Sequence, residues 1–251
     1  EGALPLTLFM MRGNNMVSGP NRTAQRTAAS VTVDEGLRAH MLRVYNYMAS
    51  GLALTGIVAY MVAGVPELTS LFVYSPLSWL FILAPLGLVL FLSFRISKMS
   101  FASAQAAFWI YAGLMGISLA SILLMYTGES IARVFFITAG TFAGMSIYGY
   151  TTKRDLTGFG QFLMMGLIGI IIASVVNLFL QSSALHFAVS VIGVLVFVGL
   201  TAYDTQKIKH AYYEADSSEV AGKKAIMGAL MLYLDFVNLF LMLMRLFGDR
   251  R

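Results

Sequence analysis

The sequence contains no cysteine and few charged residues. Without cysteine it can hold no disulfide, no thiolate metal site and no cysteine nucleophile. Only 12% of its 251 residues are charged and 58% are hydrophobic, whereas soluble domains carry roughly a quarter charged residues. A soluble fold would have too little polar material to cover its surface, so the composition predicts a membrane protein. The sequence also lacks zinc motifs, a P-loop and a nucleophile elbow, so we expect no enzyme activity and no cofactor.

Seven apolar runs are long enough, or nearly so, to cross the hydrocarbon core as helices, which needs about 20 residues each. They are 44–64, 79–94, 103–126, 131–150, 159–180, 185–206 and 225–247. The connections between them are short, so we expect one all-α domain over residues 33–251, a bundle of seven transmembrane helices. Residues 1–32 are expected to form a flexible N-terminal extension, whose first residues are a variable or added segment. The domain itself is expected to begin at residue 33 with a short helix that lies along the membrane surface.

Basic residues predict the orientation of this bundle. They cluster before the first run and after the second, fourth and sixth, and the alternate connections hold no Lys or Arg apart from Arg133 just inside the fourth run. By the positive-inside rule the N-terminus is cytoplasmic. The net charge of +5 therefore reflects membrane topology, and nucleic acid is not an expected partner.

Glycines recur on single faces of three expected helices. The pairs are Gly113 and Gly116, Gly140 and Gly144, and Gly166 and Gly169. Small residues at this spacing let the backbones of neighbouring membrane helices approach closely. We therefore expect these glycines to lie at helix–helix contacts. Pro85, inside the second run, is a candidate for a kink.

Two aspartates lie in the last two apolar runs, Asp204 in the sixth and Asp235 in the seventh. An ionised side chain at membrane depth costs about 2.5–3.5 kcal/mol on insertion scales, so such residues face the bundle interior and are usually paired. The two runs are consecutive and antiparallel, and both aspartates fall in the same half of the bilayer. If the carboxyl groups meet, both cannot readily ionise, and they share a proton. Loss of this proton would leave two negative charges that repel each other. Separation of the two helices, or entry of a cation between them, would relieve this repulsion.

Three further residues complete this candidate site. Arg95 ends the second run on the same side of the membrane and is the expected counter-charge of a pH-dependent latch. Asn238 and Arg245 share one helical face with Asp235 and Met242, so that polar face should point inward and the last helix should be central. The alternative is that each aspartate is only a local structural anchor, with Asp204 reaching the interface beside Lys207.

The segments around these aspartates resemble the Bax inhibitor-1 family, also called the transmembrane Bax inhibitor motif family. The motifs are "GLTAYDTQKIK" followed by "ALMLYLDFVNLFLMLMRLFG", with "YNYMASGLALTGIVAYMVAG" resembling an earlier span. The similarity runs from about residue 36 to 248 and is of the bacterial type, which implies an inner membrane.

The resemblance implies a pH-sensitive calcium leak channel gated by Asp204 and Asp235. These two carboxylates would hold calcium only in passing, and Arg95 is the match for an arginine associated with the latch. Calcium, protons and the lipid bilayer are then the expected partners. The family suppresses cell death in animals and plants, and some bacterial relatives restrain a membrane-bound AAA protease.

Other functions remain open at this point. A rhodopsin would need a lysine in the last span, which has none, and an intramembrane aspartyl protease would need GxGD where this sequence has "YLDF". A cation/proton exchanger could use the same carboxylates. A membrane regulator that binds a partner such as the AAA protease, without transport, is the main alternative.

Overall fold

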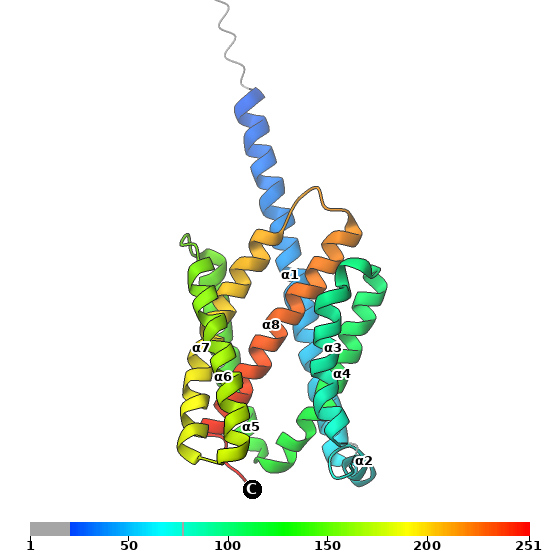
Figure 1. The fold of residues 1–251 in the computed structure, drawn as a ribbon. Coiled ribbons are helices and arrows are strands. Elements are labelled where there is room, and N and C mark those ends of the chain that lie inside the picture. The colour runs from blue at the N-terminus through cyan, green and yellow to red at the C-terminus, as the bar shows by residue number, and fades with distance from the viewer. Residues whose placement is uncertain (1–20, 77) are drawn as a thin grey trace, which may run out of the picture. The chain divides into compact units, whose positions relative to one another are not determined.

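The computed structural model describes residues 21–76 and 78–251 of the chain, and these residues are almost entirely helical (Figure 1). The helices are α1 (Asn21–Gly64), α2 (Pro66–Phe72), α3 (Ser78–Arg95), η1 (Ile96–Lys98), α4 (Phe101–Met125), α5 (Gly128–Thr151), α6 (Thr157–Leu180), α7 (Ser183–Ala211) and α8 (Ser218–Phe247). No β-strand occurs among these residues, apart from a single bridge between Tyr126 and Arg250.

Seven of these helices are long and apolar enough to cross a membrane, which confirms the predicted fold class. The spans lie at Glu35–Gly64, Ser78–Lys98, Phe101–Met125, Gly128–Thr151, Thr157–Leu180, Ser183–Ala211 and Ser218–Phe247. Two details differ from the sequence analysis. The expected surface helix and the first span form one continuous helix, α1, and the connection after it folds as α2, with Pro66 in the first turn, where its missing N–H costs no hydrogen bond.

The predicted boundary between extension and bundle stays a prediction. Residues 1–20 lie outside the described residues. Residues 21–32 belong to α1 rather than to an irregular segment, and residues 37–251 form one compact unit, four residues later than the predicted boundary.

Hydroxyl side chains mark where four of the spans begin. Ser100, Thr127, Ser182 and Ser217 each accept a hydrogen bond from the backbone N–H three residues later. Such caps satisfy amide groups that have no partner within the helix, so the short polar connections fix the start of each span.

The last helix is central, as predicted. α8 packs against α7, α5 and α4, and Figure 1 shows it running between α6 and α7 on one side and α3 and α4 on the other. Two hydrophobic clusters form the core of the bundle. One contains Tyr233 and Phe236 and the other contains Leu239 and Leu243. Because α8 supplies residues to both, it joins the two halves of the core.

The glycines only partly match the expected close contacts. A Cβ at Gly116 would lie 2.7 Å from the carbonyl oxygen of Thr55, and one at Gly166 would lie 3.2 Å from Val196. At Gly113, Gly140, Gly144 and Gly169 a Cβ would meet nothing within 4 Å, so the prediction was wrong for these four. The closest backbone approach is at Gly149, where a Cβ would lie 2.2 Å from the carbonyl oxygen of Ala202. Pro85 is buried inside α3, which continues on both sides of it.

Candidate functional site

Asp204 and Asp235 line the same cavity, which has a volume of about 620 Å³. The cavity lies beside α8, and residues of α3, α4, α6 and α7 complete its walls. Most of its lining is aliphatic, methionine or aromatic, and its polar lining residues are few. The carboxyl groups of two different helices therefore meet one apolar space within the bundle.

Each aspartate is held by the helix that carries it. Asp235 lies midway along α8 and is only 4% exposed, because α8 is covered on most sides by other helices. Asp204 is half-buried on α7, two residues after Ala202, whose carbonyl approaches Gly149 of α5. The next residue, Thr205, contacts the hydroxyl of Ser146 on α5 at 3.0 Å, and the same hydroxyl contacts that of Tyr45 on α1 at 2.6 Å. These contacts join α1, α5 and α7 next to Asp204.

The cavity leaves buried polar atoms without partners. The Oδ2 atom of Asp235 and the hydroxyl oxygen of Tyr111 are both buried and form no hydrogen bond with any described residue, and both residues line this cavity. Leaving a buried polar group unsatisfied costs about 1–3 kcal/mol. Buried groups of this kind call for a water, an ion or a proton as their partner. The arrangement is therefore suited to hold one of these three against Asp235.

Electrostatic interactions link the two carboxyl groups. Asp204 acts on Asp235, and the ammonium group of Lys207 acts on both. The Oδ2 atom of Asp235 forms no hydrogen bond with Asp204 or with any other described residue, so the sharing of a proton stays a prediction. Two carboxyl groups that face one apolar space are not both stable in the ionised form, because each raises the cost of ionising the other.

Lys207, which lies three residues after Asp204 on α7, carries a positive charge that acts on both aspartates. Arg95, the counter-charge expected from the sequence, is exposed at the end of α3 and does not line the cavity. The structure therefore does not bring Arg95 to the aspartates, and its role in a latch stays a prediction. From the sequence, Lys207 is expected only as a neighbour of Asp204 at the membrane interface.

The polar face predicted on α8 lies along the cavity. Asn238, Met242 and Arg245 line it together with Asp235. The amide of Asn238 donates a hydrogen bond to the carbonyl of Leu234 at 2.9 Å, so this amide is partly satisfied within its own helix. Arg245 also lines a second cavity of about 400 Å³, together with Asn177, Gln181 and His186. Arg245 therefore borders both the aspartate cavity and this second cavity, which lies where α6 ends and α7 begins.

Three polar residues that line the cavity were not predicted from the sequence. They are Tyr111 and Ser118 of α4 and Ser174 of α6. Only Tyr111 could have been singled out, as a hydroxyl group in the middle of an apolar span. The serines carry no pattern that separates them from ordinary helix residues.

The two aspartates have few other metal-ligating side chains around them. Among the residues that the structure describes, no group of three or more His, Cys, Asp or Glu side chains could hold a metal ion. Calcium in a lasting site takes six to eight oxygen ligands. Two carboxylates, a tyrosine hydroxyl and an amide could contact a cation only in passing.

Comparisons with known proteins agree with one another. The sequence profile described as "Inhibitor of apoptosis-promoting Bax1" matches residues 37–251. An uncharacterized protein of Rickettsia prowazekii is 53% identical over 230 residues, which cover 92% of this chain and 98% of the relative. The inner membrane protein YbhL of Escherichia coli is 48% identical over 229 residues, 90% of this chain and 98% of YbhL. A protein of Caulobacter vibrioides is 46% identical over 248 residues, 95% of this chain and 99% of that protein.

Proposed function

This chain belongs to the Bax inhibitor-1 family, and on that premise we propose that it is a pH-sensitive calcium leak channel gated by Asp204 and Asp235. The observation that carries the proposal is a buried carboxylate without a partner, Asp235, which shares an apolar cavity with a second carboxylate and an unpartnered tyrosine hydroxyl. A structural anchor would be expected to have its own hydrogen bonds, whereas this one is left open to a proton or a cation.

The proton state of the pair sets the state of the channel. With a proton on the pair, the cavity holds at most one negative charge and the helices stay together. Loss of that proton leaves two negative charges in an apolar space, a state that costs several kcal/mol unless it is compensated. Separation of the helices or entry of a cation compensates it, so calcium flux should rise as pH rises through this titration. Oxygen ligands suit calcium, and their small number lets the ion leave again.

The relatives and the charge pattern support a location in a bacterial inner membrane. YbhL is named as an inner membrane protein, so we place this chain in a bacterial inner membrane. Basic residues lie at or near the connections after α3, α5 and α7: Arg95, Lys98, Lys153, Arg154, Lys207 and Lys224. These connections face the cytoplasm by the positive-inside rule, with the N-terminus on the same side.

The test is calcium flux into liposomes that contain the purified protein and a calcium-sensitive dye, measured across a pH series. For the wild type, downhill flux should rise with pH, by at most about tenfold per pH unit for one titrating proton. Asp235→Asn and Asp204→Asn each remove one titrating group and should abolish this dependence. Asp155→Asn is the matched control, because it makes the same change in an exposed connection that does not line the cavity.

Each other outcome identifies a different function. Uphill calcium movement driven by a proton gradient would show that the protein is a cation/proton exchanger and not a leak channel. A wild type without flux at any pH would overturn transport and leave regulation of a partner, such as a membrane-bound AAA protease, which co-purification would then reveal. A pH dependence that survives in both cavity variants would show that these aspartates are not the gate.

A further inference from the structure

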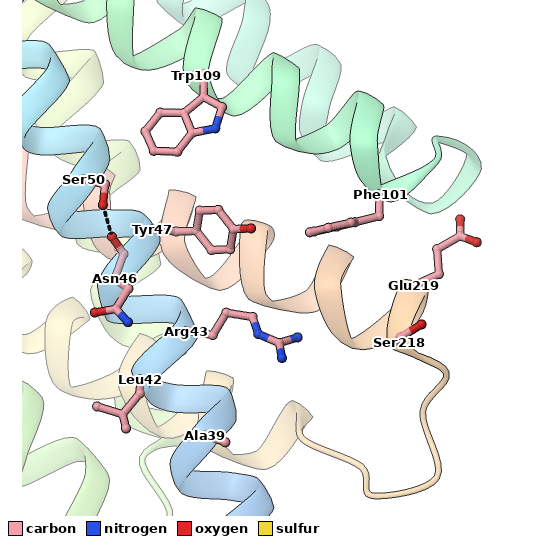
Figure 2. A pocket seen from close by; sticks show the side chains of 10 residues that line it. All are labelled: Ala39, Leu42, Arg43, Asn46, Tyr47, Ser50, Phe101, Trp109, Ser218 and Glu219. Atoms are coloured by element: carbon pink, nitrogen blue, oxygen red, sulfur yellow. Dashed lines mark hydrogen bonds between the residues drawn. The ribbon is translucent and has the colours of Figure 1, made fainter.

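A larger cavity, separate from the aspartates, lies at the end of the bundle where α4 and α8 begin. It has a volume of about 920 Å³, and Figure 2 shows side chains of α1, α4 and α8 around it. Its lining is Ala39, Leu42, Arg43, Asn46, Tyr47, Ser50, Phe101, Trp109, Ser218 and Glu219. None of these residues lines the aspartate cavity, so nothing in the proposed leak function uses them.

Hydrogen-bond donors in this pocket are free. The guanidinium group of Arg43, the hydroxyl of Tyr47 and the indole N–H of Trp109 border the pocket, and none of them forms a hydrogen bond or an ion pair with another described residue. The only hydrogen bond among the side chains in Figure 2 joins Ser50 to the backbone carbonyl of Asn46. Arg43 is exposed, and Tyr47 and Trp109 are half-buried, so these three donors are accessible to a ligand that carries acceptor oxygens.

The start of α8 adds a preference for an anion. Ser217 caps the helix, and Ser218 and Glu219 of its first turn line the pocket. The N-terminus of a helix carries partial positive charge and unpaired N–H groups, which suit a phosphate. Together with the full charge of Arg43, whose planar guanidinium matches phosphate oxygens, this places one phosphate group in the pocket.

Glu219 sets a second condition on the ligand. Its carboxylate lies 3.5 Å from the ammonium group of Lys223, but the side chain is 57% exposed and borders the pocket. A ligand with a second negative charge would be repelled by this carboxylate, whereas a ligand that also carries an amine would be attracted. The charges therefore fit a zwitterion with a phosphodiester and an ammonium group.

The surroundings fit a lipid rather than a free phosphate. The rings of Tyr47 and Trp109 lie with their centroids 6.3 Å apart, and such amphipathic aromatics collect at the headgroup level of membranes. Leu42 of α1, which lines the pocket, is 51% exposed, and Ile110, the residue after Trp109 on α4, is 58% exposed. These apolar side chains can contact acyl chains, which a free phosphate lacks.

We propose that this pocket binds one amine-bearing phospholipid, with its phosphodiester at Arg43 and the start of α8 and its ammonium group at Glu219. The bound headgroup would join α1, α4 and α8 at the end of the bundle where the basic connections lie. The site stands on contacts independent of the aspartates, so it holds whether or not the protein conducts calcium.

Tryptophan fluorescence gives a direct test, because the sequence holds only two tryptophans. The variant Trp79→Phe leaves Trp109, which lines the pocket, as the only reporter. In this background, titration of detergent-solubilised protein with phosphatidylethanolamine should give a saturable change in fluorescence. Phosphatidylglycerol should bind more weakly, and inorganic phosphate should cause no change at the same concentrations.

Substitutions separate the two halves of the proposed contact. Arg43→Ala should weaken binding of phosphatidylethanolamine by about tenfold or more, the usual effect of losing hydrogen bonds to a charged group, and Arg43→Lys should restore part of it. Glu219→Gln should lower the affinity for phosphatidylethanolamine and raise it for phosphatidylglycerol. Arg38→Ala is the matched control, since Arg38 is an exposed arginine of α1 that does not line this pocket.

Three results would overturn the proposal. Equal affinities for Arg43→Ala and Arg38→Ala would show that Arg43 does not hold the phosphate. A wild type that binds phosphatidylglycerol as tightly as phosphatidylethanolamine would remove the role of Glu219. A response to inorganic phosphate alone would make the site one for a soluble anion. Far-UV circular dichroism of each variant checks that it is folded, so that a loss of binding reports on the site.

Discussion

Substituting Gly149 by alanine should force α5 and α7 apart next to the aspartate cavity. The added Cβ would lie 2.2 Å from the carbonyl oxygen of Ala202, about 1.2 Å short of ordinary van der Waals contact. Both atoms belong to, or are bonded directly to, backbone, so no side-chain rotation can relieve the clash. Overpacking of this kind costs about 1–3 kcal/mol, and the absence of a flexible neighbour puts Gly149→Ala near the upper end.

Gly144→Ala is the matched control for this prediction. It lies in the same helix, and its new Cβ would meet nothing within 4 Å. Alanine is favoured over glycine inside a helix by about 0.8–1 kcal/mol, and this gain is similar in both variants. The difference between them therefore isolates the clash, which we expect to be about 3 kcal/mol.

Thermal unfolding in detergent, followed by circular dichroism, measures this difference. For a chain of this size 1 kcal/mol corresponds to about 2–4 °C in Tm, so Gly149→Ala should melt roughly 6–12 °C below Gly144→Ala. Because Ala202 lies two residues before Asp204, the calcium flux of Gly149→Ala should change as well. Equal melting temperatures would mean that α5 and α7 do not approach each other as closely as the structure indicates, and the position of Asp204 would have to be reconsidered.

Two further predictions concern polar contacts. Ser146→Ala removes the hydroxyl that contacts both Tyr45 and Thr205 and should lower stability by about 1–3 kcal/mol, whereas Ser93→Ala, whose hydroxyl is exposed, should change it by less than about 0.5 kcal/mol in the same unfolding assay. Hydrogen bonds from the side chain and then the backbone N–H of Thr157 lower the pKa of Asp155 below its usual 3.8, so the stability that these bonds supply is present above pH 3.8 and lost as the pH falls through the lower, folded-state value. Asp155→Asn should therefore unfold with less dependence on pH between 2 and 4 than the wild type, and an identical dependence would contradict this role.

The spans could be predicted from the sequence because the membrane imposes a simple constraint. A helix that crosses hydrocarbon must satisfy its own backbone and must be apolar over its length, and both conditions are visible in the residue order. Six of the predicted spans therefore fall within the observed helices, and the third, 103–126, extends one residue beyond Met125. The central place of α8 was predictable for the same reason, since an aspartate, an asparagine and an arginine on one face cannot be turned toward lipid.

Contacts between helices were harder to predict because they depend on rotation and depth. Gly140 and Gly144 have the spacing of a close contact, yet no neighbouring atom lies near their missing side chains. Gly149 has no partner glycine at that spacing and makes the closest approach of all. Spacing places residues on one face, but only the arrangement of the neighbouring helices decides whether that face meets backbone, side chain or lipid.

Dependence on helix packing also explains why the counter-charge of the aspartates was hard to predict. Arg95 and Lys207 are both basic residues near the ends of their spans. The sequence favours Arg95 because it ends the second run on the same side of the membrane and because the family resemblance associates an arginine with the latch. In the structure Lys207 lies on the same helix as Asp204, three residues away, so helix geometry alone keeps it close. Arg95 would have to approach from α3, and its position depends on how that helix packs.

The packing of α3 and α6 indicates where the bundle can open. These two helices line the aspartate cavity, and they are the least buried of the seven spans. Only 11% of the apolar segment of each is buried inside the protein, against 67% for α8. Moving α8 would disrupt both hydrophobic clusters at once, since it contributes to each. Moving α3 or α6 exposes far less packed surface, and the energy of two repelling carboxylates is only a few kcal/mol. We therefore expect ionisation of Asp204 and Asp235 to displace α3 and α6 while α8 stays in place, and that displacement would also carry Arg95, at the end of α3, relative to the aspartates.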